Sequence, residues 1–347
     1  MRYRVILLFL LGLLPARLLW AAPAQQAFSD WQVTCNNQNF CVARNTGEHH
    51  GLVMTLSRSA GAHTDAVLRI ELGGLESSNV KERDIAPRLL LDGAPLSLSG
   101  EHWRISPWQL MTDDPATISA FLQTVQDAKA ITLQKGAQNL SLLGLKAALL
   151  FIDAQQKRVG SETAWIEKGD EPPLSVPPAP ALKGVAVINP TPTPLTQQER
   201  SELLDYGNWR INGIRCSIDP LRREMRVTAL TDDKALLMIG CEAGAYNTID
   251  LAWVVSRTTP LTSRAVRLSL PFKTDAESRD MELTNAAFDE KSRELVTLAK
   301  GRGLADCGIQ TRWRYDGQRF RLVRYAQEPS CDNWHGPDAW PTLWITR

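Results

Sequence analysis

Alternating hydrophobic and polar positions run through most of this 347-residue chain and predict short β-strands. The clearest example is residues 28–35, where Trp31, Val33 and Cys35 alternate with polar neighbours. Further strands are predicted at 51–57, 66–72, 88–91 and 130–134, and then at 225–230, 235–241, 249–256, 264–270, 294–299, 308–315 and 319–325. The Asp-Gly pair at 316–317 separates the last two and is typical of a hairpin turn. We therefore expect antiparallel sheets.

Three other segments have apolar residues at helical spacing or the capping residues typical of a helix start. Asp114 followed by a proline is typical of a helix start, and apolar residues recur behind it on one face. A second apolar stripe covers 145–157 and is expected to end at Gly160, which suits a left-handed cap. The Thr196–Glu199 capping-box pattern predicts a short helix to about Asp205. The predicted fold class is α+β, mainly antiparallel β with a few short helices.

A proline-rich stretch divides the chain. Eight of its twenty prolines lie in residues 171–195, and proline fixes φ and lacks a backbone donor. We predict a linker there, between β-rich domains at 25–170 and 196–347. Residues 182–189 within it could form a short strand docked onto a neighbour.

The first 24 residues follow the plan of a signal peptide. Two arginines precede an apolar core at 5–14, and Ala22-Pro23-Ala24 offers small residues for cleavage. A membrane anchor needs about 17–25 apolar residues, and Pro15 and Arg17 cut this stretch short. We expect removal of residues 1–24, no integral membrane span afterwards, and a periplasmic location.

Six cysteines follow this segment. An even number of cysteines in an exported chain indicates disulfides, which persist in an oxidising compartment. Six cysteines allow 15 connectivities, and proximity favours three neighbouring couples. No Cys-x-x-Cys spacing points to redox chemistry. The expected bridges are Cys35–Cys41, Cys216–Cys241 and Cys307–Cys331.

The charge balance argues against nucleic-acid binding. The chain has 39 Lys and Arg against 38 Asp and Glu, and three of the arginines lie in the predicted signal. Proteins that bind nucleic acids generally carry a basic surplus to neutralise phosphates. No nucleic-acid partner is expected.

No catalytic or metal-binding motif is present. The five histidines lack zinc-ligand spacing, and His49-His50 beside Glu48 is interpreted as a solvated loop. Neither a Gly-x-Ser-x-Gly elbow nor the motif set of penicillin-binding proteins occurs. Asp113-Asp114 and Asp232-Asp233 are assigned to a helix cap and a turn. We expect no cofactor, no metal and no enzymatic activity.

The loop 300–308 is the most suggestive candidate site. Its glycines would let backbone amides converge on an anion, and Lys300 and Arg302 add positive charge. Tyr246 and Trp313 are the candidate flanking aromatics. The alternative, which we favour, is a tight turn whose basic side chains pair with Asp306 or lie in solvent.

Several segments resemble a known family of bacterial proteins. They are residues 28–35, 141–153, 241–247, 300–308 and 340–344, of which Gly-Ala-Tyr-Asn and Lys-Gly-Arg-Gly are the most specific. With these segments the chain resembles domain-of-unknown-function family 1176, and its first half is similar to invasion-associated locus B proteins. The resemblance implies an exported envelope protein and brings no catalytic residues.

Three functions remain open on the sequence. The first is a non-enzymatic binding protein whose partner is an envelope component or another periplasmic protein, with its site at the domain boundary. The second is an inhibitor or immunity protein against an envelope hydrolase. The third is a hydrolase of peptidoglycan or lipid whose carboxylates meet only on folding.

Overall fold

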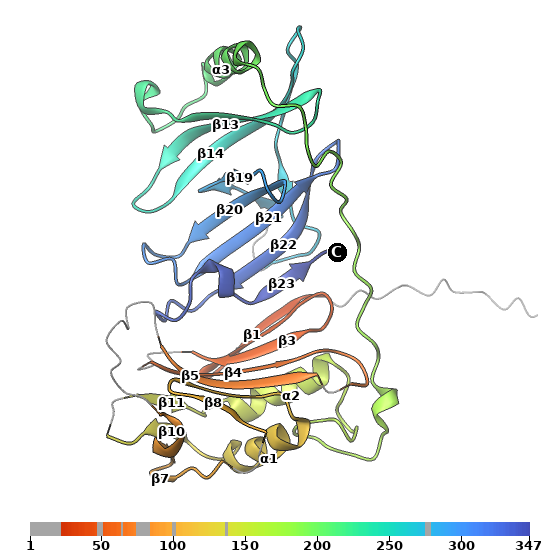
Figure 1. The fold of residues 1–347 in the computed structure, drawn as a ribbon, viewed down its shortest axis with the longest axis vertical. Coiled ribbons are helices and arrows are strands. Elements are labelled where there is room, and N and C mark those ends of the chain that lie inside the picture. The colour runs from red at the N-terminus through yellow and green to blue at the C-terminus, as the bar shows by residue number, and fades with distance from the viewer. Residues whose placement is uncertain are drawn as a thin grey trace, which may run out of the picture.

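The computed structural model describes residues 22–46, 51–63, 65–73, 84–98, 102–135, 138–274 and 279–347. These residues form antiparallel sheets with three α-helices, which confirms the predicted fold class. Figure 1 shows the main sheets stacked along the long axis of the molecule, with the N-terminal half at one end. Residues 1–21 of the predicted signal peptide and the His49-His50 pair lie outside the described residues.

The N-terminal half contains a seven-stranded antiparallel sheet, of which the first five strands form a meander, with two helices on one face (Figure 1). Inward-facing side chains of β2 (Trp31–Cys35), among them the fully buried Trp31, form its core together with the apolar faces of the helices. A four-stranded sheet closes the core. The strand order of the first sheet is β1 (Ala24–Phe28), β2 (Trp31–Cys35), β3 (Cys41–Asn45), β4 (Leu52–Arg58), β5 (Ala66–Leu72), β9 (Gln109–Thr112) and β8 (Arg104–Ser106); that of the second is β11 (Asn139–Ser141), β10 (Ala130–Leu133), β6 (Leu89–Leu91) and β7 (Ala94–Pro95).

Two of the three helices differ from expectation at their ends. Helix α1 (Pro115–Val125) begins as predicted, with the Asp114 carboxylate accepting the Thr117 amide. Helix α2 (Leu145–Gln155) stops before Gly160, because Lys157 already takes the left-handed conformation at φ 54°. Helix α3 (Gln197–Ile211) has the predicted capping box but continues well past Asp205, because Leu203, Gly207 and Ile211 pack onto the sheet below.

The C-terminal half is a sandwich of two sheets with α3 on its outer side (Figure 1). Both faces of β13 are covered: Leu236 and Met238 point into the core between the sheets, and Leu237 and Ile239 point towards α3. The first sheet contains β12 (Met225–Ala229), β13 (Lys234–Ala243), β14 (Thr248–Ser256) and β15 (Ser263–Ala265), with β18 (Leu283–Thr284) also on β14; the second contains β19 (Ala287–Asp289), β20 (Glu294–Lys300), β21 (Gly308–Tyr315), β22 (Phe320–Glu328) and β23 (Thr342–Ile345); β16 (Leu268–Ser269) pairs with β17 (Asp280–Met281).

The single strand predicted at 264–270 is two short ones. Its first residues pair with β14, and the chain then leaves that sheet so that β16 pairs with β17. The expected hairpin at 316–317 is present, with Gly317 at φ 92° and the Asp316 amide bonded to the Arg319 carbonyl.

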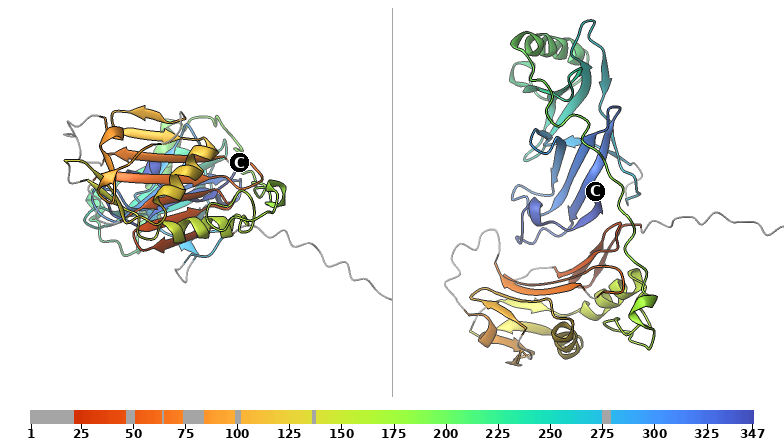
Figure 2. Two further views of the ribbon diagram at one scale, coloured as in Figure 1. Left: turned by 90° about the horizontal axis from the view of Figure 1, so that it is seen from below. Right: turned by 45° about the vertical axis from the view of Figure 1, so that its right-hand side comes forward.

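The proline-rich linker runs in extended form along one side of the C-terminal half (Figures 1 and 2). The expected docking occurs, because the Arg347 amide donates to the Lys183 carbonyl and the Val185 amide donates to the Arg347 carbonyl. Residues 182–189 nevertheless form no strand. These backbone bonds fix the linker beside the end of β23.

Candidate functional site

The three disulfides form between the neighbouring cysteines expected from the sequence: Cys35–Cys41, Cys216–Cys241 and Cys307–Cys331. The first bridge closes a small loop at the end of the β2–β3 hairpin. Within it, the Asn37 side chain accepts the Ile345 amide at 2.9 Å and donates to the Ile345 carbonyl at 3.0 Å. The disulfide loop therefore attaches the N-terminal half to β23 of the C-terminal half.

The structure brings three of the four predicted site residues together. Tyr246 donates its hydroxyl to the Gly301 carbonyl at 3.0 Å, so it lies against the loop that carries Lys300 and Arg302. Trp313 is absent from this surface: it is fully buried in the core between the two sheets. Its assignment as a flanking aromatic is corrected, because β21 turns this position inward.

The chemistry of the 300–308 loop fits the tight turn rather than an anion nest. Arg302 makes two hydrogen bonds to the buried carboxylate of Asp306, and these bonds lower the pKa of Asp306. Asp306 also accepts the Asn333 amide at 2.6 Å. The amides of Lys300 and Gly301 are bonded to Asn247 and to the Cys307 carbonyl. The loop thus pairs Arg302 with a carboxylate of its own, that of Asp306.

A groove of about 1100 Å³ lies instead beneath the linker. One wall is linker residues 183–188, and the other is the β15 edge with the segment that follows it. The rest of the lining comes from the β21–β22 hairpin, from Val254 of β14 and Asp280 of β17, and from Trp344 and Thr346 near the C-terminus. Ligand pockets typically hold about 300–1,000 Å³, so this volume is ample for a small molecule. We call this feature the linker groove.

Hydrogen bonds hold the linker wall at both of its ends. Arg314 donates to the Val185 carbonyl, in addition to the backbone bonds with Arg347. Further along the linker, Asp232 accepts the Thr193 amide at 2.7 Å and the Asn189 side chain at 3.2 Å. The bonds from Thr193 lower the pKa of Asp232. The wall is therefore held by specific bonds despite its lack of regular structure.

The floor of the linker groove is the core of the sandwich itself. Leu270, Phe320, Leu322 and Trp344 line it, and all four belong to the apolar cluster between the two sheets. They are at most 7% exposed. The base of the groove therefore lies against side chains of the sandwich core, at the edge of the sandwich.

The rim is predominantly basic. Among the described lining residues, five cationic side chains face two carboxylates. Arg321 pairs with Asp316 at 2.5 Å, and Arg264 donates to the Gln318 carbonyl at 3.2 Å. The basic lining residues are Lys183, Arg264, Arg267, Arg319 and Arg321, and the acidic ones are Asp280 and Asp316. The side chains of Arg267 and Arg319 make no hydrogen bond or ion pair to any described residue.

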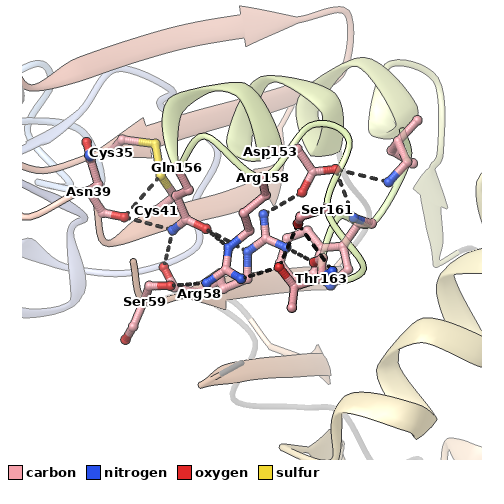
Figure 3. Close-up of polar contacts among 12 residues, drawn as sticks. Cys35, Asn39, Cys41, Arg58, Ser59, Asp153, Gln156, Arg158, Ser161 and Thr163 are labelled. Carbon is pink, nitrogen blue, oxygen red and sulfur yellow. Dashed lines mark hydrogen bonds and ion pairs between the residues drawn. A yellow bond between two sulfur atoms is a disulfide. The ribbon is translucent and has the colours of Figure 1, made fainter. Parts of the chain in front are cut away.

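A second group of arginines lies buried where α2 meets the meander (Figure 3). Arg58 donates to Asp153 at 2.6 Å and to Gln156 at 2.7 Å, and burial lowers the pKa of Arg58 to about 10. Arg158 donates to Gln156, to Thr163 and to three backbone carbonyls. The cluster joins α2 to the strands and offers no open position for a ligand.

Further polar contacts hold the two halves together. Arg44 of β3 pairs with Glu328 at 2.7 Å and with Asp332 at 2.6 Å, with all three side chains largely buried. Burial opposes the charge on Arg44, but the two carboxylates outweigh it and raise its pKa. The orientation of the halves is thus specified by side-chain bonds as well as by the linker.

No group of three or more potential metal ligands occurs among the described residues. Within the same part of the chain, none of the helices combines the length and apolar character that crossing a bilayer requires.

These features define a disulfide-stapled α+β protein with a basic groove at the edge of its C-terminal sandwich. The chain belongs to the family described as Protein of unknown function (DUF1176), whose sequence model matches residues 25–347. It is 79% identical over 347 residues, the whole of both chains, to Uncharacterized protein YpfG of Escherichia coli (strain K12). The family resemblance seen in the sequence is confirmed.

A solved structure, that of invasion associated protein B from Bartonella henselae, aligns with a TM-score of 0.25 and 15% identity. It covers 39% of this chain and 99% of that chain. With so low a score, this likeness carries no argument about the function of the present protein.

Proposed function

We propose that this protein is an exported, non-enzymatic binding protein of the cell envelope, and that the linker groove holds its ligand. The observation that carries the proposal is the groove itself: about 1100 Å³, with a core-lined floor and a fastened linker as one wall. Concave sites with an apolar lining and a few polar groups are the usual form of small-ligand sites.

Two observations support export to the periplasm. The family match begins at residue 25, directly after the predicted signal segment. All six cysteines are paired in disulfides, which persist in oxidising compartments. Fractionation of cells followed by N-terminal sequencing tests this part. A mature chain starting near residue 25 in the periplasmic fraction is expected, and an intact Met1 in the cytosol would contradict it.

The binding role is tested by closing the groove. Ala186 on the linker wall and Ala265 on the β15 wall are both exposed and line the cavity, so Ala186→Trp and Ala265→Trp fill it from opposite sides. Ala181→Trp is the matched control, because Ala181 is an exposed linker residue outside the lining.

Each protein is purified from envelope extract, denatured, and its released small molecules are measured by mass spectrometry. We expect a compound that accompanies the wild type and the Ala181→Trp variant and is lost from both groove variants. The same compounds in equal amount from all four proteins would overturn the groove as the binding site.

A further inference from the structure

We infer that the ligand of the linker groove is a single-chain anionic amphiphile, with its hydrocarbon chain against the core floor and its anionic group at Arg267 and Arg319. This inference rests on the proposed function and names the class of ligand. The groove combines an apolar interior with a basic rim, and each part restricts the chemistry of an occupant.

The floor favours a hydrocarbon chain. Phe320, Leu322 and Trp344 are members of the sandwich core, so the part of an occupant that lies against these side chains meets mainly apolar surface. Each buried methylene contributes about 0.8 kcal/mol, whereas a polar group without a partner there costs free energy. A peptide backbone or a sugar would bring unpaired donors and acceptors to this floor, and an acyl chain brings none.

The rim favours an anion. Arg267 follows the β15 edge, and Arg319 lies in the β21–β22 turn. The hydrogen bond from Arg264 to the Gln318 carbonyl joins these same two elements, so both cations lie where the two sheets approach each other. A guanidinium presents paired donors that match a carboxylate or phosphate.

The charge balance of the rim supports the same class. Arg321 is already occupied by Asp316, whereas Arg267 and Arg319 have no partner among the described residues. With five cations against two carboxylates, the described lining has a surplus of positive charge. An anionic head group would complement this surplus, and a cationic or neutral one would leave it unbalanced.

The test is displacement of a fluorescent fatty acid from the mature protein by defined probes. The probes are dodecanoate, dodecyl phosphate, the uncharged 1-dodecanol, the short hexanoate, and vesicles of anionic phospholipid. Comparing dodecanoate with dodecyl phosphate shows whether the anionic head group is a carboxylate or a phosphate.

Binding is compared among the wild type, the double variant Arg267→Ala with Arg319→Ala, and a charge-matched control. The control is Arg215→Ala with Arg222→Ala, two exposed arginines of the same half that lie outside the groove.

We expect dodecanoate or dodecyl phosphate to bind about tenfold more tightly than 1-dodecanol, because two arginines contact the head group. The groove double variant should lose this preference while the control keeps it. Hexanoate should bind more than about 100-fold more weakly than dodecanoate, because it buries fewer methylenes.

Three results would overturn the inference: equal affinity for 1-dodecanol and dodecanoate, unchanged charge preference in the groove double variant, or capture by vesicles but by no single-chain probe. Its failure is distinguishable from failure of the proposed function. If no amphiphile binds, yet a co-purified compound is lost from the Ala186→Trp and Ala265→Trp variants, the groove binds a ligand of another class.

Discussion

Two pairs of arginines, one pair in each half, occupy opposite environments. In the N-terminal half, Arg58 and Arg158 are essentially buried, and both have hydrogen-bonded partners in the protein (Figure 3). In the C-terminal half, Arg267 and Arg319 are exposed at the rim of the linker groove and have no partner among the described residues. The first pair consolidates packing, and the second pair is available to a ligand.

The environment of Arg302, in the loop at 300–308, is intermediate between those of the two pairs. Arg302 is 45% exposed, yet it is matched by Asp306, whose side chain is fully buried. A basic loop is therefore a poor guide to a binding site when the same loop contributes its own carboxylate. Whether a cation is already paired decides what it can do, and pairing is a property of the fold.

The largest expected effect comes from removing the anion of the buried cluster. Asp153→Ala should lower the free energy of unfolding by about 3–5 kcal/mol, because it leaves buried Arg58 without its counter-charge. Chemical denaturation measures this loss. The matched control is Asp127→Ala, which removes an exposed pair with Lys146 and should cost less than about 1 kcal/mol. Equal losses in the two variants would contradict the structural role of the cluster.

A smaller loss is expected in the 300–308 loop. Asp306→Ala removes a buried acceptor of hydrogen bonds from Arg302 and from the Asn333 amide, so the free energy of unfolding, measured by chemical denaturation, should fall by about 1–3 kcal/mol.

The same loop is not expected to bind the ligand, so ligand capture should remain unchanged in the double variant Lys300→Ala with Arg302→Ala. Lost capture with unchanged stability in that double variant would restore this loop as the binding site.

A pH-dependent effect is expected at the start of α3. Hydrogen bonds from Arg257 lower the pKa of Glu199 from its ordinary value near 4.5 to about 2. A lowered folded-state pKa stabilises the protein above pH 4.5, and this contribution is lost as the pH falls towards 2. Unfolding followed between pH 6 and pH 2 should show a smaller acid-induced decline in Glu199→Gln than in the wild type. Parallel curves would show that this pair contributes nothing.

The smallest effect on stability is expected at the groove rim. Arg267→Ala with Arg319→Ala should change the free energy of unfolding by less than about 0.5 kcal/mol, because neither side chain has a described partner to lose. Thermal denaturation without ligand measures the change. A loss comparable to that of Asp153→Ala would mean that these arginines are structural, like Arg58.

Local patterns in the sequence predicted most strands, the helix starts and the disulfide pairs. The capping box at Thr196 and the cap at Asp114 depend on neighbouring residues alone. Other features depended on distant contacts. β3 was not predicted: it ends in the polar residues Arg44 and Asn45, which break the apolar pattern, and the fold buries both of them through contacts with other parts of the molecule.

The site was harder to predict than the fold. The sequence marked the 300–308 loop because its glycines and basic residues are adjacent, and the favoured alternative, a tight turn with a basic side chain paired to Asp306, is the arrangement present; the full burial of the Asp306 side chain depends on the fold. The linker groove draws its lining from residues as far apart as Lys183 and Thr346. The one local signal was the apolar run at 185–188, which indicated that the linker docks but not that it covers an opening.

Photo-crosslinking tests the central claim most directly. A hexadecanoate that carries a diazirine on its chain is bound to the mature protein, activated by light, and the labelled peptides are identified by mass spectrometry. The account predicts labels on the groove lining, at residues 320–322 and at Trp344 on β23. Labels confined to the 300–308 loop, or to the N-terminal half, would contradict it.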